Sequence, residues 1–245
     1  MGTHTKEYTF GRIMTQQLKY DFSTPPVCNP DFFFPLDLKL DPEEKENFIK
    51  VGLPPYRKKV IGHALSNVGN ADEYFAKTKK NANEYVKPLG LEVRKMTLFL
   101  SDENQTSHVV HCDGVRGPDG IPTMLEARLS YYEIAEAPGA IRWWDGLKPE
   151  LTIHGANEYT QERISCIVDW ADDIRKNKLK WSDVPQPVFD VVTSVPSALL
   201  RTNQAHHVIQ GPGLRVTVSC QLVFAGTRRP EGVWKHIQQN IHLLK

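Results

Sequence analysis

Apolar and polar residues alternate without a break from residue 214 to residue 222, near the C-terminal end of the chain. The alternation is plain in the run Val216-Thr217-Val218-Ser219. Successive side chains of a strand point to opposite faces of a sheet, so this pattern predicts a strand with one buried face and one polar face. The Gly211-Pro212-Gly213 sequence just before it is a turn signal and predicts where the strand begins.

Several earlier segments are also predicted to be strands because they are short and rich in apolar residues. They are the ranges 91–100, 127–134 and 140–144. Two helices are predicted before them. Asp41 is a suitable N-cap, Pro42 follows at the first helical position, and this helix is expected to end near Gly52. The second helix is expected over residues 71–86, before Pro88 and Gly90.

The spacing of apolar residues changes between residues 155 and 187. Five apolar residues recur there at helical spacing: Ile164, Ile167, Val168, Ala171 and Ile174. The pattern predicts an amphipathic helix over residues 158–178, inserted between strands. Two roles for it stay open, a cover for one face of the sheet or a lid over a site.

Helices followed by many short strands predict an α+β fold whose body is an antiparallel double-stranded barrel. We expect one structural domain, with an N-terminal arm and supporting helices over residues 1–90 and the core over residues 91–245. The arm is rich in proline around Phe32-Phe33-Phe34. Its aromatic run is expected to pack over the body, and the alternative is an exposed patch for a partner.

The composition is that of an ordinary soluble globular protein. Of its 245 residues 40% are hydrophobic and 24% are charged, and the net charge of +1 gives no reason to expect nucleic acid or an anionic membrane as a partner. The four cysteines form no Cys-x-x-Cys pair, which argues against a zinc knuckle or a disulfide framework. No apolar run is long enough for a membrane span or a signal peptide, so we expect a cytoplasmic protein.

Candidate chemistry begins at His111-Cys112-Asp113. Residues two apart on an extended chain point to the same side, so one imidazole and one carboxylate can bind a single metal ion. The segment 201–208 contains His206 and His207 and is expected to fold back onto this motif. A third ligand from that segment completes a set of two histidines and one carboxylate, which suits non-haem Fe(II) and leaves positions open for substrates.

Arg215 is the first polar residue of the strand that follows these histidines. A guanidinium group is suited to bidentate binding of a carboxylate. Its place shortly after a candidate metal ligand favours an anion site over an ordinary solvated strand face.

Together these residues resemble the Fe(II)- and 2-oxoglutarate-dependent oxygenases. That family has His-x-Asp, a long gap, His-x-Val, a turn with glycine, and an arginine followed by a small hydroxylated residue. The residues that match the pattern are His111, Asp113, His206, Val208, Arg215 and Thr217. The strand over residues 127–132 and the later Gly139 are similar to the prolyl-hydroxylase-like branch, and the resemblance spans residues 93–224.

The resemblance implies a double-stranded β-helix core of the jelly-roll or cupin-like kind. It also implies Fe(II) bound by His111, Asp113 and His206, with 2-oxoglutarate held by Arg215 and Thr217. Tyr132 is our candidate for a further cosubstrate contact, and Ser130 and Tyr131 are the alternatives.

The implied reaction is hydroxylation of an unactivated C–H bond in an amino acid, a peptidyl side chain or another small molecule. It uses O2 and yields succinate and carbon dioxide, with ascorbate as a supporting reductant. Asp113 favours hydroxylation, because the family's halogenases lack this carboxylate.

His206 is the expected third ligand, because neighbouring residues of a strand point to opposite sides and only one can reach the metal. The family's His-x-Val spacing selects His206, and a bulge in the strand would select His207 instead. Two other functions remain. One is a cupin-like metal enzyme that does not use 2-oxoglutarate, and the other is a non-catalytic jelly-roll binding module. The sequence does not set the oligomeric state.

Overall fold

The computed structural model describes residues 25–55, 66–101, 110–136, 138–145, 152–154, 163–167, 178–180, 183–209 and 213–244. Of these, residues 66–70, 101, 152–154 and 163–167 are described by their backbone alone. The described strands are β1 (Phe33–Leu36), β2 (Ser66–Asn70), β3 (Leu91–Ser101), β4 (His111–Arg116), β5 (Pro122–Met124), β6 (Ala127–Ala135), β7 (Ala140–Trp143), β8 (Thr152–His154), β9 (Arg163–Ile167), β10 (Phe189–Val192), β11 (Ser197–Arg201), β12 (His206–Ile209) and β13 (Arg215–Phe224).

Helices are fewer and lie mostly near the two ends of the described chain. The α-helices are α1 (Pro42–Asn47), α3 (Ala76–Val86) and α5 (Val233–Asn240). Shorter helical turns are η1 (Phe48–Gly52), η2 (Ala71–Glu73), η3 (Lys87–Leu89) and η5 (Ile241–Leu243). None of the helices that the structure describes has the length and apolar character needed to cross a bilayer.

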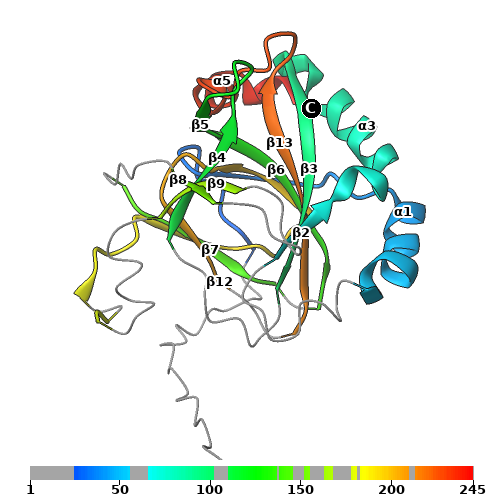
Figure 1. Ribbon diagram of the computed structural model, residues 1–245, viewed down its shortest axis with the longest axis horizontal. Coiled ribbons are helices and arrows are strands. Elements are labelled where there is room, and N and C mark those ends of the chain that lie inside the picture. Colours follow the sequence, from blue (N-terminus) through cyan, green and yellow to red (C-terminus); the bar gives the residue numbers. More distant parts are fainter. Residues whose placement is uncertain are drawn as a thin grey trace, which may run out of the picture.

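Two antiparallel sheets form the body of the protein, which together with the helices gives an α+β fold (Figure 1). The first sheet has the strand order β1-β11-β6-β13-β3-β2. The second has the order β10-β7-β12-β4-β9-β8, and β5 pairs with β4 beside this path. Strand β4, which carries the His-x-Asp motif, therefore lies in the middle of the second sheet.

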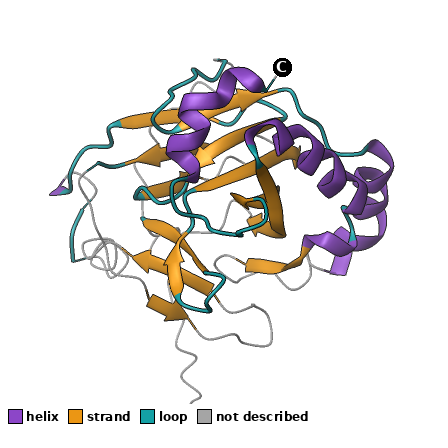
Figure 2. Ribbon diagram, turned by 90° about the horizontal axis from the view of Figure 1, so that it is seen from above, coloured by secondary structure: helices purple, strands orange, loops and turns teal. Residues whose placement is uncertain are grey.

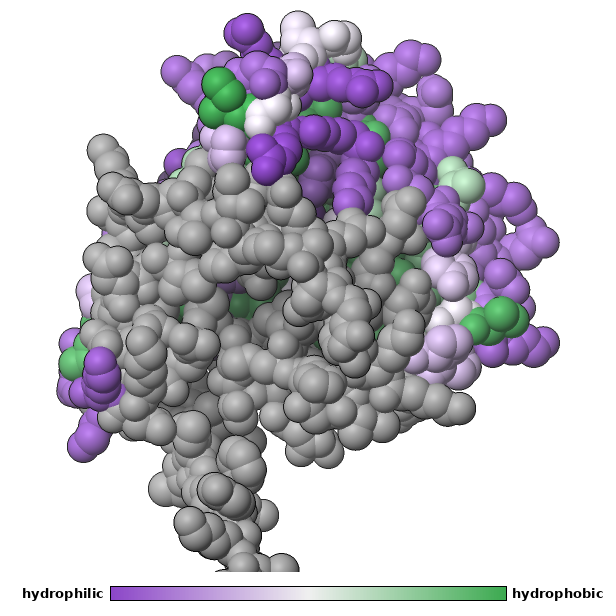
Figure 3. Space-filling view, in the orientation of Figure 1, coloured by the Kyte–Doolittle hydropathy of each residue, from purple (hydrophilic) through white to green (hydrophobic). Residues whose placement is uncertain are grey.

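The helices cover one face of the first sheet (Figure 2). A large apolar core fills the space between the helices and this sheet. Val86 from α3 and Ile237 from α5 pack in the same cluster as residues of β3, β6 and β13. The outer surface of the helices is mainly hydrophilic (Figure 3). A second apolar cluster joins the two sheets and includes Tyr132, Trp143 and Leu200.

Strand β13 confirms the predicted alternation and extends its meaning. Val216 and Val218 are fully buried in the core beneath the helices. Arg215 and Ser219 are also buried, on the opposite face of the strand. The polar face of this strand is therefore directed to the interior between the sheets, where polar side chains need partners.

The aromatic run of the N-terminal arm is buried, as the packed-arm interpretation predicts. Phe33 is fully buried, and Phe32 stacks on Phe189 with ring centroids 5.8 Å apart. Strand β1 pairs with β11 at the edge of the first sheet. The alternative of an exposed aromatic patch is therefore wrong for these residues.

The helix expected over residues 71–86 begins later than predicted, at Ala76. Residues 71–73 form the short turn η2, and Phe75 has a non-helical backbone with φ −129° and ψ 44°. Phe75 is fully buried against Phe48, with ring centroids 5.2 Å apart. Burial of this ring fixes the chain direction and overrides the local helical preference.

The helical insertion expected over residues 158–178 is wrong for residues 163–167, which form strand β9. Strand β9 pairs with β4 in a register that sets Asp113 opposite Ser165, and with β8 on its other side. These ladders satisfy backbone groups of β4, which a helix at this position would leave unpaired. The rest of the expected helix, apart from residue 178, lies outside the described residues, and so does its expected role as a lid.

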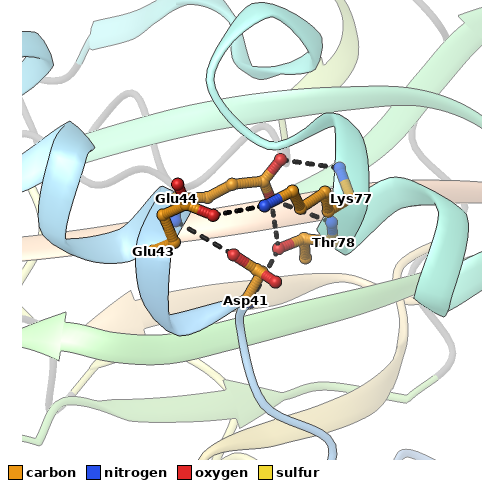
Figure 4. A network of polar contacts seen from close by, with 5 residues as sticks. All are labelled: Asp41, Glu43, Glu44, Lys77 and Thr78. Atoms are coloured by element: carbon orange, nitrogen blue, oxygen red, sulfur yellow. Dashed lines mark hydrogen bonds and ion pairs between the residues drawn. The ribbon is translucent and has the colours of Figure 1, made fainter.

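Helix α1 starts where the sequence predicts. The Asp41 side chain accepts a hydrogen bond from the Glu44 backbone N–H at 3.1 Å, which makes Asp41 the N-cap. Glu44 in turn reaches the start of α3 (Figure 4). Its carboxylate accepts hydrogen bonds from the backbone N–H groups of Lys77 at 2.6 Å and Thr78 at 2.9 Å. Because Phe75 offers no side-chain cap, Glu44 caps α3 from another helix.

Replacing Glu44 with alanine is therefore expected to lower the free energy of unfolding by about 1–2 kcal/mol, the scale of a lost helix cap. Urea unfolding followed by circular dichroism measures the change. Glu46→Ala is the matched control, because Glu46 is exposed on the same helix. Equal stability of both variants would show that the contact between the helices contributes nothing.

Candidate metal centre and its cavity

Strand β4 positions the first two candidate ligands. His111 and Asp113 lie two residues apart on it and point to the same side, whereas Cys112 between them is fully buried. The Nε2 atom of His111 is 3.5 Å from Oδ1 of Asp113. Strand β4 has neighbours on both sides, so its backbone, which carries both side chains, is hydrogen-bonded within the sheet.

Strand β12 brings His206 to the same place. His206 is the residue that pairs with His111 across the two strands, and their ring centroids are 4.6 Å apart. Nδ1 of His206 lies 2.9 Å from the Gln204 carbonyl oxygen. In the tautomer that satisfies this carbonyl, Nδ1–H donates to it and Nε2 is left as an acceptor, which is the arrangement common for histidines that bind metal.

One possible ligand atom from each of His111, Asp113 and His206 lies within 4.8 Å of the others. A single ion can bridge atoms at that spacing, and two histidines with one carboxylate are a suitable donor set for Fe(II). His207 lies opposite Arg142 in the ladder with β7 and is not part of this group. The geometry agrees with the choice of His206, whose role as a ligand stays a prediction.

The charges around Asp113 keep it ionised. Burial by itself would raise the pKa of Asp113, but Arg128, His206 and His111 together lower the pKa well below its ordinary value. The strongest of these partners is Arg128, whose Nε lies 2.5 Å from Oδ2 of Asp113. This contact uses Oδ2 and leaves Oδ1, the oxygen near His111, as the one available to a metal.

Burial and the neighbouring His111 lower the pKa of His206 to about 4. The folded protein thus keeps His206 neutral, the form that binds metal, at any pH above that value. A proton would take the place of the metal only in clearly acidic solution.

The metal-free protein is expected to lose stability as the pH falls from about 6.5 to about 4. In this window the unfolded chain binds a proton at His206 and the folded chain does not, so the loss reaches on the order of 3 kcal/mol. Asp113 contributes at lower pH, because its own pKa is lowered from an ordinary value near 4.

Urea unfolding in the presence of a chelator, at several values of pH, measures this loss. His206→Gln should make the decline shallower, and His207→Gln should leave it as it is. The same slope in wild type and in His206→Gln would contradict the assignment.

The three candidate ligands face a cavity between the two sheets, with about 750 Å³ of empty space counting its open mouth. Much of its wall is apolar, with residues such as Ile141, Trp143 and Val208. Besides the candidate ligands, most of its polar wall comes from β6 and β13, with Arg201 and Thr202 added at the end of β11. The residues of β6 and β13 are Arg128, Ser130, Tyr132, Arg215, Thr217 and Ser219.

The three residues expected to hold a cosubstrate, Arg215, Thr217 and Tyr132, all line this cavity. The guanidinium group of Arg215 lies over the Tyr132 ring, 5.4 Å from its centroid. Arg215 is 3% exposed, and its Nε and Nη1 atoms have no hydrogen-bond partner among the described residues. Burial lowers the pKa of this guanidinium only from a very high ordinary value, so it stays charged.

Gly139 makes room for Arg215. A Cβ atom at position 139 would lie 2.5 Å from Nη1 of Arg215 and 2.7 Å from the Ile209 carbonyl oxygen. Real Cβ atoms do not approach other atoms so closely, so any larger residue must displace the guanidinium or the strand. The glycine that the sequence places after β6 is thus explained by close approach to this arginine.

The structure separates the three candidates on β6 that the sequence leaves open. Tyr131 faces the core under the helices, whereas Ser130 and Tyr132 face the cavity. The Ser130 hydroxyl lies 2.9 Å from the Ser219 hydroxyl. Burial raises the pKa of Tyr132, so its hydroxyl is a neutral group that can donate a hydrogen bond.

Sequence reasoning missed Arg128, which lines the cavity and contacts the candidate ligand Asp113. A signal for it exists, because residue 128 shares a strand face with Ser130 and Tyr132. His108, the other histidine considered as a ligand, lies outside the described residues.

No protein-family model matches this chain, and no curated protein matches it in sequence. Among solved structures, it is similar to HygX from Streptomyces hygroscopicus, described with nickel and 2-oxoglutarate bound, at a TM-score of 0.42 and 11% identity over 78% of this chain and 81% of that one. It is also similar to EvdMO1, at a TM-score of 0.36 and 11% identity over 78% of this chain and 46% of that one. Likenesses this distant carry no weight for the function of this chain.

Proposed function

We propose that this protein is a non-haem Fe(II)- and 2-oxoglutarate-dependent dioxygenase that hydroxylates a small molecule or a peptidyl side chain. Its two sheets would then be the double-stranded β-helix of that class. The main support for the proposal comes from the environment of Arg215. A buried guanidinium, whose Nε and Nη1 have no hydrogen-bond partner among the described residues, lines the same cavity as a cluster of two histidines and one carboxylate.

The donor set fits the metal. His206 is held by the Gln204 carbonyl so that its Nε2 is available, and Asp113 is held ionised by Arg128. His111 completes the set from the same strand as Asp113. When bound, Fe(II), 2-oxoglutarate and O2 would supply the oxidising chemistry, with succinate and carbon dioxide as products.

The wall of the cavity fits the cosubstrate. Arg215 would bind the carboxylate of 2-oxoglutarate that lies far from the metal, because an anionic acceptor would satisfy the two N–H groups that have no partner in the described part of the chain. Tyr132, whose ring lies under the Arg215 guanidinium, and Thr217, two residues further along β13, line the same cavity and would add hydroxyl groups to the same carboxylate. The apolar residues of the wall would exclude water from the reacting centre.

The two other functions leave parts of this cavity without a task. A cupin-like metal enzyme that does not use 2-oxoglutarate has no anion for Arg215. A non-catalytic binding module has no use for three convergent ligands, of which Asp113 is kept charged while buried. Burying these groups costs free energy. The oxygenase function gives each of them a binding partner, which offsets that cost.

The test is a screen for release of succinate in the presence of Fe(II), 2-oxoglutarate and ascorbate. Free amino acids, peptides and other small metabolites are added in turn, and the substrate is the compound that raises the succinate yield and gains one oxygen atom by mass spectrometry. Asp113→Ala is the control and should release none. A protein that binds no 2-oxoglutarate and forms no succinate with any class of compound would refute the proposal.

A further inference from the structure

Arg128 is a second buried arginine in the cavity, and it is only partly paired. The residue is 7% exposed, and its Nε donates to Oδ2 of Asp113. Its guanidinium lies over the Phe99 ring, 5.5 Å from the centroid. Its Nη1 atom is buried and has no hydrogen-bond partner among the described residues.

This contact uses less of the guanidinium than a structural ion pair usually does. An arginine that serves only to hold a carboxylate tends to bind it through two parallel N–H groups. Here the Asp113 pair is made through Nε, and no described residue satisfies Nη1 at the wall of a cavity that also holds the candidate metal ligands. A buried charged donor without an acceptor is costly, so an acceptor is expected to arrive with a ligand.

The charge of the cavity favours an anionic ligand as well. Among the described lining residues, Asp113 is the one acid and faces three arginines, Arg128, Arg201 and Arg215. Arg201 is already engaged, because its Nε donates to Asn203 at 3.0 Å and its Nη1 to the Asp31 carbonyl at 3.4 Å. A divalent metal would add two positive charges, and the 2-oxoglutarate dianion would cancel only these two.

The remaining wall bounds the body of such a ligand. Most of it is apolar, with aromatic and aliphatic side chains from both sheets: Phe99, Leu100, Ile141, Trp143, Leu200 and Val208. The single lining acid among the described residues, Asp113, is already paired with Arg128. An ammonium group on the ligand would therefore find no free carboxylate on this part of the wall.

From these contacts we propose that Arg128 is a binding residue for the primary substrate, and that the substrate is a small carboxylate with an uncharged, largely apolar body. Its carboxylate accepts a hydrogen bond from Nη1 of Arg128, beside the metal centre. The proposal rests on the proposed oxygenase function and names the substrate class of the same cavity. It also gives Arg128 two contacts, one to a metal ligand and one to the substrate.

The test uses Mn(II)-loaded protein, with and without 2-oxoglutarate and without O2. The probes are 3-phenylpropanoate and hexanoate, each compared with its neutral primary amide. Paramagnetic broadening of the probe's NMR signals reports binding near the metal without any turnover. The signals of both carboxylates should broaden in a saturable way. The amides should bind at least about tenfold more weakly, the scale of one charged hydrogen bond.

Arg128→Met should remove this preference for the carboxylates, while its affinity for 2-oxoglutarate stays within about twofold of the wild-type value. Both are measured at saturating Mn(II), because the variant also loses the contact to Asp113, which would weaken metal binding. Arg128→Lys is the second variant, which keeps a cation beside Asp113 if the first fails to bind metal. It should bind the carboxylates about tenfold more weakly than wild type, because one ammonium cannot occupy the positions of both Nε and Nη1.

Equal binding of carboxylates and amides by the wild type would overturn the proposal. Carboxylate binding that is unchanged in both variants would do the same. A fall in 2-oxoglutarate affinity alone would assign the anion to the cosubstrate and also overturn it. Failure of the wild type to bind 2-oxoglutarate is a separate result against the proposed function, because the probes are measured without 2-oxoglutarate too.

Discussion

Replacing Asp113 with alanine is expected to weaken Fe(II) binding by more than about 100-fold, since losing a partner of a ligand alone typically costs 10- to 100-fold. The variant also leaves Arg128 without its carboxylate, so this buried guanidinium would repel the metal. Titration of the metal-free protein with Fe(II) in the absence of O2, followed by calorimetry, measures the affinity. Circular dichroism shows whether the fold survives.

The histidine pair supplies the matched control for this prediction. His206→Ala should lose Fe(II) as Asp113→Ala does, and His207→Ala should bind it as wild type does, because His207 lies outside the cluster. Loss of metal in His207→Ala with retention in His206→Ala would mean that the ligand is the neighbouring residue. Tight Fe(II) binding by Asp113→Ala would refute the assignment of this cluster as the metal centre.

Replacing Arg215 with methionine is expected to weaken 2-oxoglutarate binding by about 10- to 150-fold, which corresponds to the 1.5–3 kcal/mol of a charged hydrogen bond. Fe(II) affinity should stay unchanged, because Arg215 is expected to bind the cosubstrate and is not one of the three candidate ligands. Methionine fills much of the same volume, so the loss reports the charge and the N–H groups. Calorimetric titration of the Fe(II)-loaded protein with 2-oxoglutarate measures it.

Two further variants separate the anion site from simple packing. Gly139→Ala keeps the Arg215 side chain but places a methyl group against its guanidinium. This variant should therefore also weaken 2-oxoglutarate binding. Arg142→Met removes an arginine that pairs with Asp190 outside the cavity and should change nothing. Unchanged 2-oxoglutarate affinity in Arg215→Met would assign this arginine to structure.

Much of the sheet could be predicted from the sequence, because local pattern and burial agree there. The alternation in β13 gives both its buried face and its cavity face, and the short apolar runs give β3, β6 and β7. The six candidate site residues, His111, Asp113, His206, Arg215, Thr217 and Tyr132, all line one cavity. Their roles as ligands and binding groups stay predictions.

What could not be predicted depends on contacts far along the chain. Strand β9 forms because β4 offers it a ladder, which the helical spacing of Ile164 and Ile167 cannot reveal. Helix α3 starts late because Phe75 packs against Phe48, more than twenty residues earlier in the sequence. Arg128 reaches Asp113 only because the two sheets stack, and a single-strand pattern has no information on that distance.

One cavity is expected to bind Fe(II) and then 2-oxoglutarate, which is held by the metal and by Arg215. The most direct measurement is titration of 2-oxoglutarate into wild-type protein without O2, once with Fe(II) bound and once without metal. We expect one equivalent of 2-oxoglutarate to bind tightly to the Fe(II)-loaded protein and at least about tenfold more weakly to the metal-free protein, because chelation adds a metal bond to the charged hydrogen bonds. Binding of equal strength in both states, or none in either, would show that the cavity does not hold 2-oxoglutarate through a bound metal.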